Sequence, residues 1–202
     1  IEKVITDIQK ATLGQAEIVV VDGSKDRTPV IAKKLGARVI RQEPKGYGVA
    51  VKAALLAATK PIIVTVDCDG TYPASQIPEL VSLVREGYDI VSGSRLRGGV
   101  KNMTLLNAFG NRMFALIGSL LYGIWITDVT TGMRAYKREV IQNINWTENT
   151  GLSAELILRP ALKGYRIREV PIHYEPRLGD TKLNPFTGGA RIFKSIIKCR
   201  FM

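Results

Sequence analysis

The sequence predicts an α/β fold, in which helices flank a mostly parallel, Rossmann-like sheet. Two observations predict it. Runs rich in β-branched residues over 17–22, 37–41 and 61–66 alternate with helical patterns over 25–35 and 47–59. The runs are also almost continuously apolar, which is typical of strands in a sheet that is covered by helices on both faces. Strands separated by crossover helices run parallel, so their carboxyl ends meet at one edge.

The pattern continues beyond the third strand. We expect a helix over 75–86, a strand over 88–92, a second helix over 152–164 and a strand with alternating sides over 166–174. The basic, glycine-rich segment 95–101 is predicted to be a loop, either an anion clamp or an ordinary solvated turn.

The most apolar stretch, 105–126, has about the length of a membrane span, but Asn107, Asn111 and Arg112 interrupt its first half. This pattern favours a helix that is partly buried and partly laid on a bilayer surface, although an ordinary buried helix fits as well. The tail over 190–202 alternates apolar and basic residues, as in an amphipathic helix against acidic lipid or a solvated terminal helix.

Composition narrows the class of partner. The chain has 202 residues with 29 Lys and Arg against 18 Asp and Glu, a net charge of +11, which indicates an anionic partner: a phosphorylated substrate, an acidic membrane surface or nucleic acid. Aromatic residues form only 7% of the chain and do not interleave with basic runs, so we expect no nucleic-acid partner. Cys68 and Cys199 lie far apart, which disfavours a disulfide scaffold or a zinc site and fits reduced surroundings.

Length and organisation indicate one domain. Residues 1–202 suffice for a single core, and no Pro-, Gly- or Ser-rich linker divides them. The chain begins at Ile1 without Met, already in a helical pattern, which suggests that a preceding segment is missing.

Three carboxylates follow predicted strands. Asp22 ends the first, and Asp67 and Asp69 end the third, immediately before Gly70. Alternate residues of a strand point the same way, so the last two side chains can converge on one hard cation. Such pairs are often solvated turn residues, but ligands of parallel sheets bind at this edge, which favours the metal interpretation.

Segments in the same order along the chain resemble the family 2 glycosyltransferases, and among them the polyprenyl-phosphate sugar synthases of the dolichyl-phosphate mannose synthase type. They are 19–28, 46–50, 67–69, 92–99, 128–136 and 177–183. Three features depart from the pattern: the family's first strand with its Pro and Asn-Glu signature is absent, Thr71 stands where a Gln is common, and an acceptor-side Arg early in the apolar helix is not evident.

The resemblance implies a GT-A fold, Mg²⁺ or Mn²⁺ as cofactor, a nucleotide-diphosphate sugar as donor and dolichyl or polyprenyl phosphate as acceptor. It favours GDP-mannose, then UDP-glucose, and inversion in a single displacement. It implies a location at the cytoplasmic face of a membrane, peripheral or anchored by segments outside the chain.

The resemblance also assigns roles to individual residues. A lipid phosphate is already anionic and needs positioning by basic groups rather than a strong general base. The expected catalytic residues are Asp69, Asp128 and Arg95; the metal ligands are Asp67 and Asp69; the donor-binding residues are Asp22, Ser24, Lys45, Gly46, Asp67 and Arg134; and the acceptor-phosphate residues are Arg95, Arg177, Thr181 and Lys182.

Structural alternatives remain for several of these side chains. Asp22 suits a turn cap through Ser24, Asp128 a helix cap before Thr130, and Arg134 a counter-charge to Asp128. Two other functions also remain open. One is transfer to a hydroxyl acceptor, which would require a carboxylate base, and the other is a non-catalytic basic protein that binds membranes or nucleic acid.

Overall fold

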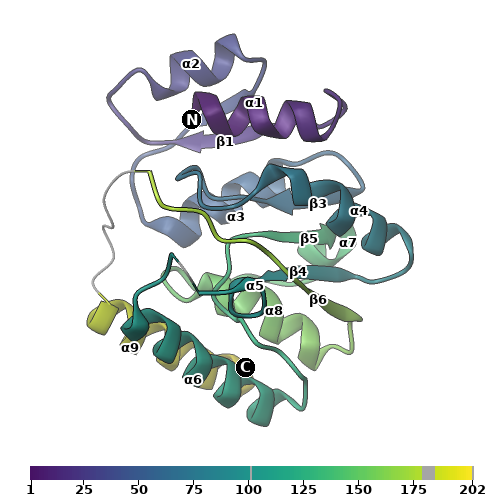
Figure 1. Ribbon diagram of the computed structural model, residues 1–202, viewed down its shortest axis with the longest axis vertical. Helices are drawn as coiled ribbons and strands as arrows, with labels where there is room; N and C mark the ends of the chain where they lie inside the picture. The colour runs from purple at the N-terminus through teal and green to yellow at the C-terminus, as the bar shows by residue number, and fades with distance from the viewer. Residues whose placement is uncertain (101, 179–184, 202) are drawn as a thin grey trace.

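The computed structural model describes residues 1–100, 102–178 and 185–201. The strands are β1 Val19–Asp22, β2 Arg38–Arg41, β3 Ile62–Thr65, β4 Ile90–Ser94, β5 Arg134–Lys137 and β6 Ile167–Pro171. The helices are α1 Glu2–Ala11, α2 Thr28–Lys34, α3 Tyr47–Ala57, the 3₁₀ turn η1 Ala74–Gln76, α4 Ile77–Arg85, α5 Arg95–Gly98, α6 Leu105–Tyr122, α7 Arg138–Gln142, α8 Leu152–Leu162 and α9 Pro185–Arg200. Figure 1 shows helices on both sides of the strands, so the predicted α/β class is confirmed.

Four strands form the main sheet in the order β3-β5-β4-β6. β5 runs antiparallel to both of its neighbours, and β4 is parallel to β6. Three of these four strands therefore point the same way, and their carboxyl ends share one edge. This is the mostly parallel sheet that the sequence predicts.

Two local features differ from the prediction. The segment expected to be a loop over 95–101 begins with the short helix α5, whose first turn is capped because the Arg97 N–H donates to Ser94 Oγ at 3.2 Å. The segment 134–137, recognised only as part of a motif, is the interior strand β5, with Ala135 opposite both Val64 and Val91.

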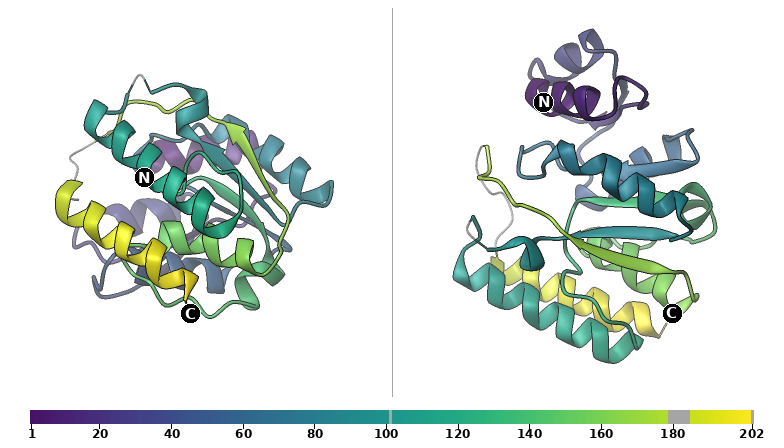
Figure 2. Two further views of the ribbon diagram at one scale, coloured as in Figure 1. Left: turned by 90° about the horizontal axis from the view of Figure 1, so that it is seen from below. Right: turned by 45° about the vertical axis from the view of Figure 1, so that its right-hand side comes forward.

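β1 and β2 form a separate parallel pair. Within the described residues β1 pairs only with β2 and β3 only with β5, so each has one unpaired edge. A cavity of about 780 Å³ lies between β1 and β3 and is lined by residues of these two strands and of α1, α3 and α4. Glu17, which precedes β1 and also lines the cavity, accepts hydrogen bonds through its carboxylate from Thr59 N and Oγ1 at 2.9 and 2.6 Å. α1, α2 and β1 lie together at one end of the molecule in the right-hand view of Figure 2, and α1 packs against η1 and α4 while β1 packs against α3.

α6, α8 and α9 form a helical layer under the main sheet. α6 and α9 lie side by side in Figures 1 and 2, and the Tyr122 hydroxyl donates to Ile196 O at 2.7 Å between them. α6 ends at Gly123, which adopts the left-handed conformation with φ 64°. None of the described helices has the length and apolar character needed to cross a membrane.

Candidate active site

The predicted metal carboxylates follow β3 at the carboxyl edge of the sheet. Asp69 is held by the turn, because its Oδ1 accepts from Thr71 N at 3.0 Å and from Thr71 Oγ1 at 2.6 Å. Gly70 gives the turn a φ of 76°, which disfavours a residue with a side chain. Thr71, which stands in place of the expected Gln, is buried and fixes the orientation of one metal carboxylate.

Asp67 lies against Gly132 of the 128–136 segment. A Cβ atom at Gly132 would collide with the Asp67 carboxylate, so that glycine leaves room for the carboxylate. The Gly132 N–H donates to the Tyr72 hydroxyl at 2.7 Å, which fixes this close approach. Burial and the charge of Asp69 together raise the pKa of Asp67. A cation between the two carboxylates would remove this repulsion.

Arg177 approaches the same pair. Its Nη1 lies 2.9 Å from Asp69 Oδ2, and the next residue, Leu178, donates its N–H to Asp69 O at 2.9 Å. Arg177 and Leu178, the described residues of the predicted acceptor segment, therefore contact the turn at Asp69, and a guanidinium occupies the position of a cation on Asp69. Thr181 and Lys182, the other predicted acceptor residues, lie outside the described residues.

The residues present fit a hard divalent cation with an open coordination sphere. Two carboxylates are typical of a Mg²⁺ or Mn²⁺ site in which water and phosphate oxygens supply the other ligands. Among the described residues no three or more acidic, His or Cys side chains cluster, so the protein offers this cation no closed cage. The predicted pair Asp67 and Asp69 is the set from which a metal site would be built.

Arg95 and Asp128 form a buried ion pair beneath this edge. Arg95 Nε lies 2.7 Å from Asp128 Oδ2, and Nη2 lies 2.8 Å from Oδ1, so the contact is bidentate. Their side chains are 10% and 0% exposed. Burial opposes ionisation of Asp128, but Arg95 and the backbone N–H of Thr130 outweigh it and lower the pKa of the carboxyl. The Arg95 guanidinium also lies over the Tyr174 ring at 5.5 Å.

Two residues to which the sequence assigned no role in the site support this pair. Buried Glu169 on β6 accepts from Thr127 N and Oγ1 at 2.8 and 2.9 Å and from Asp128 N at 3.0 Å. Burial raises the pKa of Glu169, despite these hydrogen bonds. On the other side, Thr130 Oγ1 donates to Asn111 Oδ1 of α6 at 2.9 Å. Buried polar groups require such partners, but no local pattern reveals which strand or helix supplies them.

The predicted donor side is built from the ends of β1 and β2. Buried Asp22 forms an ion pair with Arg41, which closes the carboxyl end of this pair of strands. Ser24 Oγ donates to Asp26 Oδ1 at 2.8 Å, so Ser24 belongs to the next turn and does not bridge to Asp22. These residues lie at and just after the carboxyl ends of β1 and β2, where ligands of α/β sheets bind.

Asn149 anchors the predicted glycine segment. Its Nδ2 donates to Lys45 O at 3.0 Å and its Oδ1 accepts from Gly48 N at 2.8 Å. Gly46 has φ 107°, and a Cβ there would collide with the Asn149 side chain. The glycines therefore allow close backbone packing, and the exposed Lys45 side chain is the part left for a ligand.

Arg134 is not where the donor-binding prediction requires it. Its side chain is 1% exposed and donates to Ser92 Oγ, Ser153 O and Val129 O at 3.1, 2.5 and 2.9 Å. It neither reaches the open edge nor pairs with Asp128. The reason is its position on the interior strand β5, where its guanidinium satisfies buried carbonyl groups.

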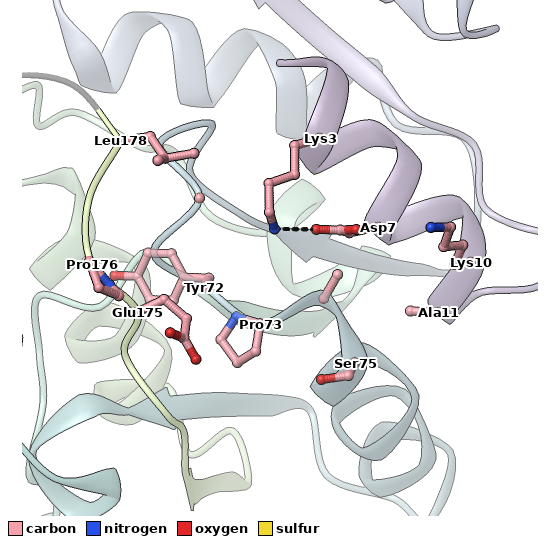
Figure 3. A pocket seen from close by; sticks show the side chains of 12 residues that line it. Lys3, Asp7, Lys10, Ala11, Tyr72, Pro73, Ser75, Glu175, Pro176 and Leu178 are labelled. Carbon is pink, nitrogen blue, oxygen red and sulfur yellow. Dashed lines mark hydrogen bonds and ion pairs between the residues drawn. The ribbon is translucent and has the colours of Figure 1, made fainter.

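A cavity of about 730 Å³ opens beside the metal turn. Figure 3 shows α1, with the Lys3–Asp7 ion pair at 2.6 Å, on one side and the segments 70–75 and 175–178 on the other. Exposed Glu175 and the apolar side chain of Leu178 line it. A solvent-accessible carboxylate therefore lies in a cavity next to Gly70.

Comparison with known proteins identifies the family. Residues 1–144 match the model described as glycosyl transferase family 2. A protein named dolichyl-phosphate hexose transferase from Haloferax volcanii is 58% identical over 198 residues, which cover 98% of this chain and 87% of that protein. The low-salt glycan biosynthesis hexosyltransferase Agl6 of the same organism is 35% identical over 181 residues, 87% of this chain and 44% of that protein.

Solved structures show the same fold. Glucosyl-3-phosphoglycerate synthase from Mycobacterium tuberculosis, crystallised with Mn²⁺, UDP-glucose and phosphoglyceric acid, superposes with a TM-score of 0.77 at 21% identity. The match covers 100% of this chain and 75% of that chain, so the expected GT-A fold is confirmed. The chain belongs to glycosyl transferase family 2.

Proposed function

We propose that the protein transfers a hexose from a nucleotide-diphosphate sugar to the phosphate of dolichyl or another polyprenyl phosphate. One observation carries the proposal: the Arg177 guanidinium lies 2.9 Å from Asp69, so a phosphate-binding group and a metal carboxylate meet at one edge. The name of the 58% identical relative, a dolichyl-phosphate hexose transferase, supports the acceptor class.

The chemistry is a single displacement. An oxygen of the acceptor phosphate forms a bond to the anomeric carbon of the sugar, while the bond from that carbon to the nucleoside diphosphate breaks and its electron pair leaves with the diphosphate. The configuration inverts. A divalent cation at Asp67 and Asp69 supplies charge neutralisation at the leaving group. Arg177 holds the incoming phosphate near the anomeric carbon, because an arginine fork matches phosphate oxygens.

In this proposal Asp128 and Arg95 hold neighbouring segments in place and take no direct part in the chemical step. Asp128 is 0% exposed and both of its oxygens are bonded, so it is not available as a proton acceptor. The pair fixes the start of α5 relative to the loop 127–130. A phosphate acceptor needs no base, which fits an edge whose most buried carboxylate is already neutralised.

For the donor we favour GDP-mannose, followed by UDP-glucose. Asp22, Ser24 and Lys45 form the donor side, where the strand ends and the exposed turn lie. The mycobacterial synthase was crystallised with UDP-glucose, so that donor is the second one in the test.

We also propose that residues 1–202 act as a single catalytic domain whose sheet takes one more strand. The cavity of about 780 Å³ has an unpaired strand on each side. Thr59 N donates to Glu17, and these two residues precede β3 and β1, whereas Asp22 ends β1 and Asp67 follows β3; this is what two strands running in the same direction would show. The first strand that the family resemblance leads us to expect fits between them.

Transfer to a hydroxyl acceptor is the second candidate. Glu175 favours it, because this exposed carboxylate lines the cavity next to Gly70, and a carboxylate can act as a general base. Glu175→Gln separates the two functions. A phosphate acceptor requires no base, so the variant retains turnover, whereas transfer to a hydroxyl group falls by about 100-fold.

The test is a transfer assay with the full protein. Polyprenyl phosphate and Mg²⁺ or Mn²⁺ are supplied with labelled GDP-mannose and UDP-glucose in parallel, and label is followed into an organic-extractable, mildly acid-labile product. Label from one donor establishes transfer to lipid phosphate and names the sugar. Intact nucleotide-sugar binding with no lipid label from either donor contradicts the proposal. We place the reaction at the cytoplasmic face of a membrane, with the acidic surface of that membrane as a further partner.

A further inference from the structure

One amide side chain bridges the two ends of the predicted donor segment 45–48. Asn149 Nδ2 donates to Lys45 O at 3.0 Å, and Asn149 Oδ1 accepts from Gly48 N at 2.8 Å. An asparagine amide carries a hydrogen-bond donor and an acceptor on one plane, and both are used here. The side chain comes from the loop between α7 and α8, 101 residues along the chain from Gly48.

The bridged segment has few restraints of its own. Gly46, the residue before α3, adopts φ 107° and has no side chain that could cap the helix. Asn149 takes over that task, because its oxygen accepts one of the first N–H groups of α3, that of Gly48. Two glycines in four residues also give the segment a large conformational entropy when it is not held. The Asn149 amide therefore supplies a restraint that the segment lacks.

The glycines are matched to this one asparagine. A Cβ atom at Gly46 would collide with the Asn149 side chain, and a Cβ atom at Gly48 would collide with the Asn149 backbone. The segment and the loop can therefore approach each other closely only because both positions lack a side chain.

Two carboxylates that the proposed reaction does not use hold Asn149 from the other side. Buried Glu155 on α8 accepts from Glu148 N at 2.9 Å. The Glu148 carboxylate in turn accepts from Ser195 Oγ and lies 2.7 Å from Lys198 Nζ, both on α9. The residue that precedes Asn149 is therefore fixed by two helices. A side chain on a fixed backbone loses less conformational entropy when it forms hydrogen bonds, so Asn149 is well placed to hold the donor segment.

We propose that Asn149 is a positioning residue for the nucleotide-diphosphate sugar. This rests on the proposed function and adds a residue to it. By holding the Lys45 carbonyl, Asn149 fixes the backbone from which the exposed Lys45 ammonium group meets the donor diphosphate. Tyr47, which lies inside the bridge, lines the cavity of about 780 Å³ together with Asp67. The bridged segment therefore extends from the loop of Asn149 to the side of the site where a predicted metal carboxylate lies.

Loss of the bridge acts on donor affinity through the population of one conformation. When a protein adopts its binding-competent conformation only part of the time, its apparent affinity falls by that fraction. Without the amide of Asn149, the segment 45–48 would sample conformations in which the Lys45 side chain is directed elsewhere. Donor binding should therefore weaken, while the acceptor and the chemical step at saturating donor are affected much less.

The experiment measures binding of GDP-mannose and of UDP-glucose to the full protein by calorimetry, with Mn²⁺ and without acceptor. Asn149→Ala should weaken binding of the donor by about tenfold. Turnover at saturating donor and the KM for polyprenyl phosphate should stay within about threefold of the wild type. Asn145→Ala, which changes an exposed asparagine of the same loop, is the matched control and should leave donor affinity unchanged. Equal donor affinity of Asn149→Ala and the wild type overturns the proposal.

A double-mutant cycle tests whether Asn149 acts through Lys45. In the background of Lys45→Ala, the further change Asn149→Ala should weaken donor binding by less than about twofold, because the group that Asn149 positions is already gone. Losses that multiply as for independent sites overturn the proposal.

Asn149→Asp separates positioning from helix capping. The carboxylate keeps an acceptor for Gly48 N but has no N–H for Lys45 O, so the free energy of unfolding should stay close to that of the wild type while donor binding still falls. Wild-type donor affinity in Asn149→Asp would mean that only the cap matters, and it overturns the proposal. Transfer to lipid phosphate is assayed separately, so a wild type that binds donor and makes no lipid product contradicts the proposed function without changing the result for Asn149.

Discussion

Two arginine–carboxylate pairs lie near the same edge of the sheet, and they differ in nearly every physical respect. Arg95–Asp128 is bidentate and buried, with side chains 10% and 0% exposed. Arg177–Asp69 is a single contact of 2.9 Å with side chains 40% and 14% exposed. A buried pair that loses one partner leaves an uncompensated charge, whereas an exposed pair exchanges partners at little energetic cost. The first pair therefore suits a fixed scaffold, and the second suits a site that binds ligands.

The largest effect is expected at the buried pair. Asp128→Asn leaves the Arg95 guanidinium without its counter-charge, and we expect a loss of about 3–5 kcal/mol in the free energy of unfolding. Chemical denaturation followed by circular dichroism measures it. A loss below about 1 kcal/mol would mean that Arg95 finds solvent or another acceptor and that the pair is not a scaffold.

Asp69→Asn tests the more exposed of the two pairs, Arg177–Asp69. The amide retains an oxygen for the contacts with Thr71 but loses the charge that binds a cation, so we expect turnover to fall by about 100-fold, about 2.7 kcal/mol in barrier height. The free energy of unfolding should change by less than about 1 kcal/mol, as for an exposed pair. Mn²⁺ binding by calorimetry and denaturation on the same sample check both parts. Unchanged Mn²⁺ affinity would refute the metal role of Asp69.

Lowering the pH should weaken the buried Arg95–Asp128 pair, and the lowered pKa of Asp128 gives the direction of the effect. The pKa of Asp128 is lowered in the folded state, so the stability it contributes is present above its ordinary value near 3.8 and is lost as the pH falls toward the lowered value. One such group changes the free energy of unfolding by at most about 1.4 kcal/mol per pH unit. Unfolding free energies measured from pH 5 downward should fall less steeply in Asp128→Asn than in the wild type. Parallel curves would contradict the assignment.

The smallest effect concerns Arg177. Removing it by Arg177→Ala frees Asp69 Oδ2 from a competing cation, so Mn²⁺ affinity should rise by up to about fivefold, in line with the 0–1 kcal/mol of an exposed pair. Transfer to the lipid phosphate should fall, because in the proposed function the same side chain holds the acceptor phosphate. Lys3→Ala, which breaks an exposed ion pair on α1, is the control and should leave Mn²⁺ affinity unchanged. A parallel fall of Mn²⁺ affinity and turnover in Arg177→Ala would mean that Arg177 supports the metal site rather than competing with it.

The sequence predicted the parts of the fold that depend on local patterns. Alternation of apolar runs with helical periodicity located β1, β2 and β3 and the helices between them, since such periodicity directly reflects burial. It missed β5, because a strand that begins with an arginine does not resemble an interior strand. The side chain of Arg134 reaches carbonyl groups on distant segments, and this context outweighs the usual exposure of charged residues.

The sequence predicted which residues form the candidate site better than it predicted the contacts that hold them in place. Asp67 and Asp69 follow a strand, so their common edge follows from topology. Asn149 contacts a segment 101 residues away, and Glu169 supports Asp128 from 41 residues away. Their positions follow from tertiary packing, which no local spacing encodes. The stretch 105–126 was recognisable as apolar, but only the fold separates the side chains of α6 that are buried from those that are exposed.

The unpaired edges of β1 and β3 carry a practical consequence. A strand edge with free N–H and C=O groups is a template on which another chain can add, and two such edges facing one apolar cavity double this exposure. During expression, residues 1–202 would be prone to aggregate through these edges in a concentration-dependent way. A version in which both edges are paired should remain monodisperse at higher concentration, so the same two strands whose ends carry Asp22 and Asp67 would also decide the solubility of the protein.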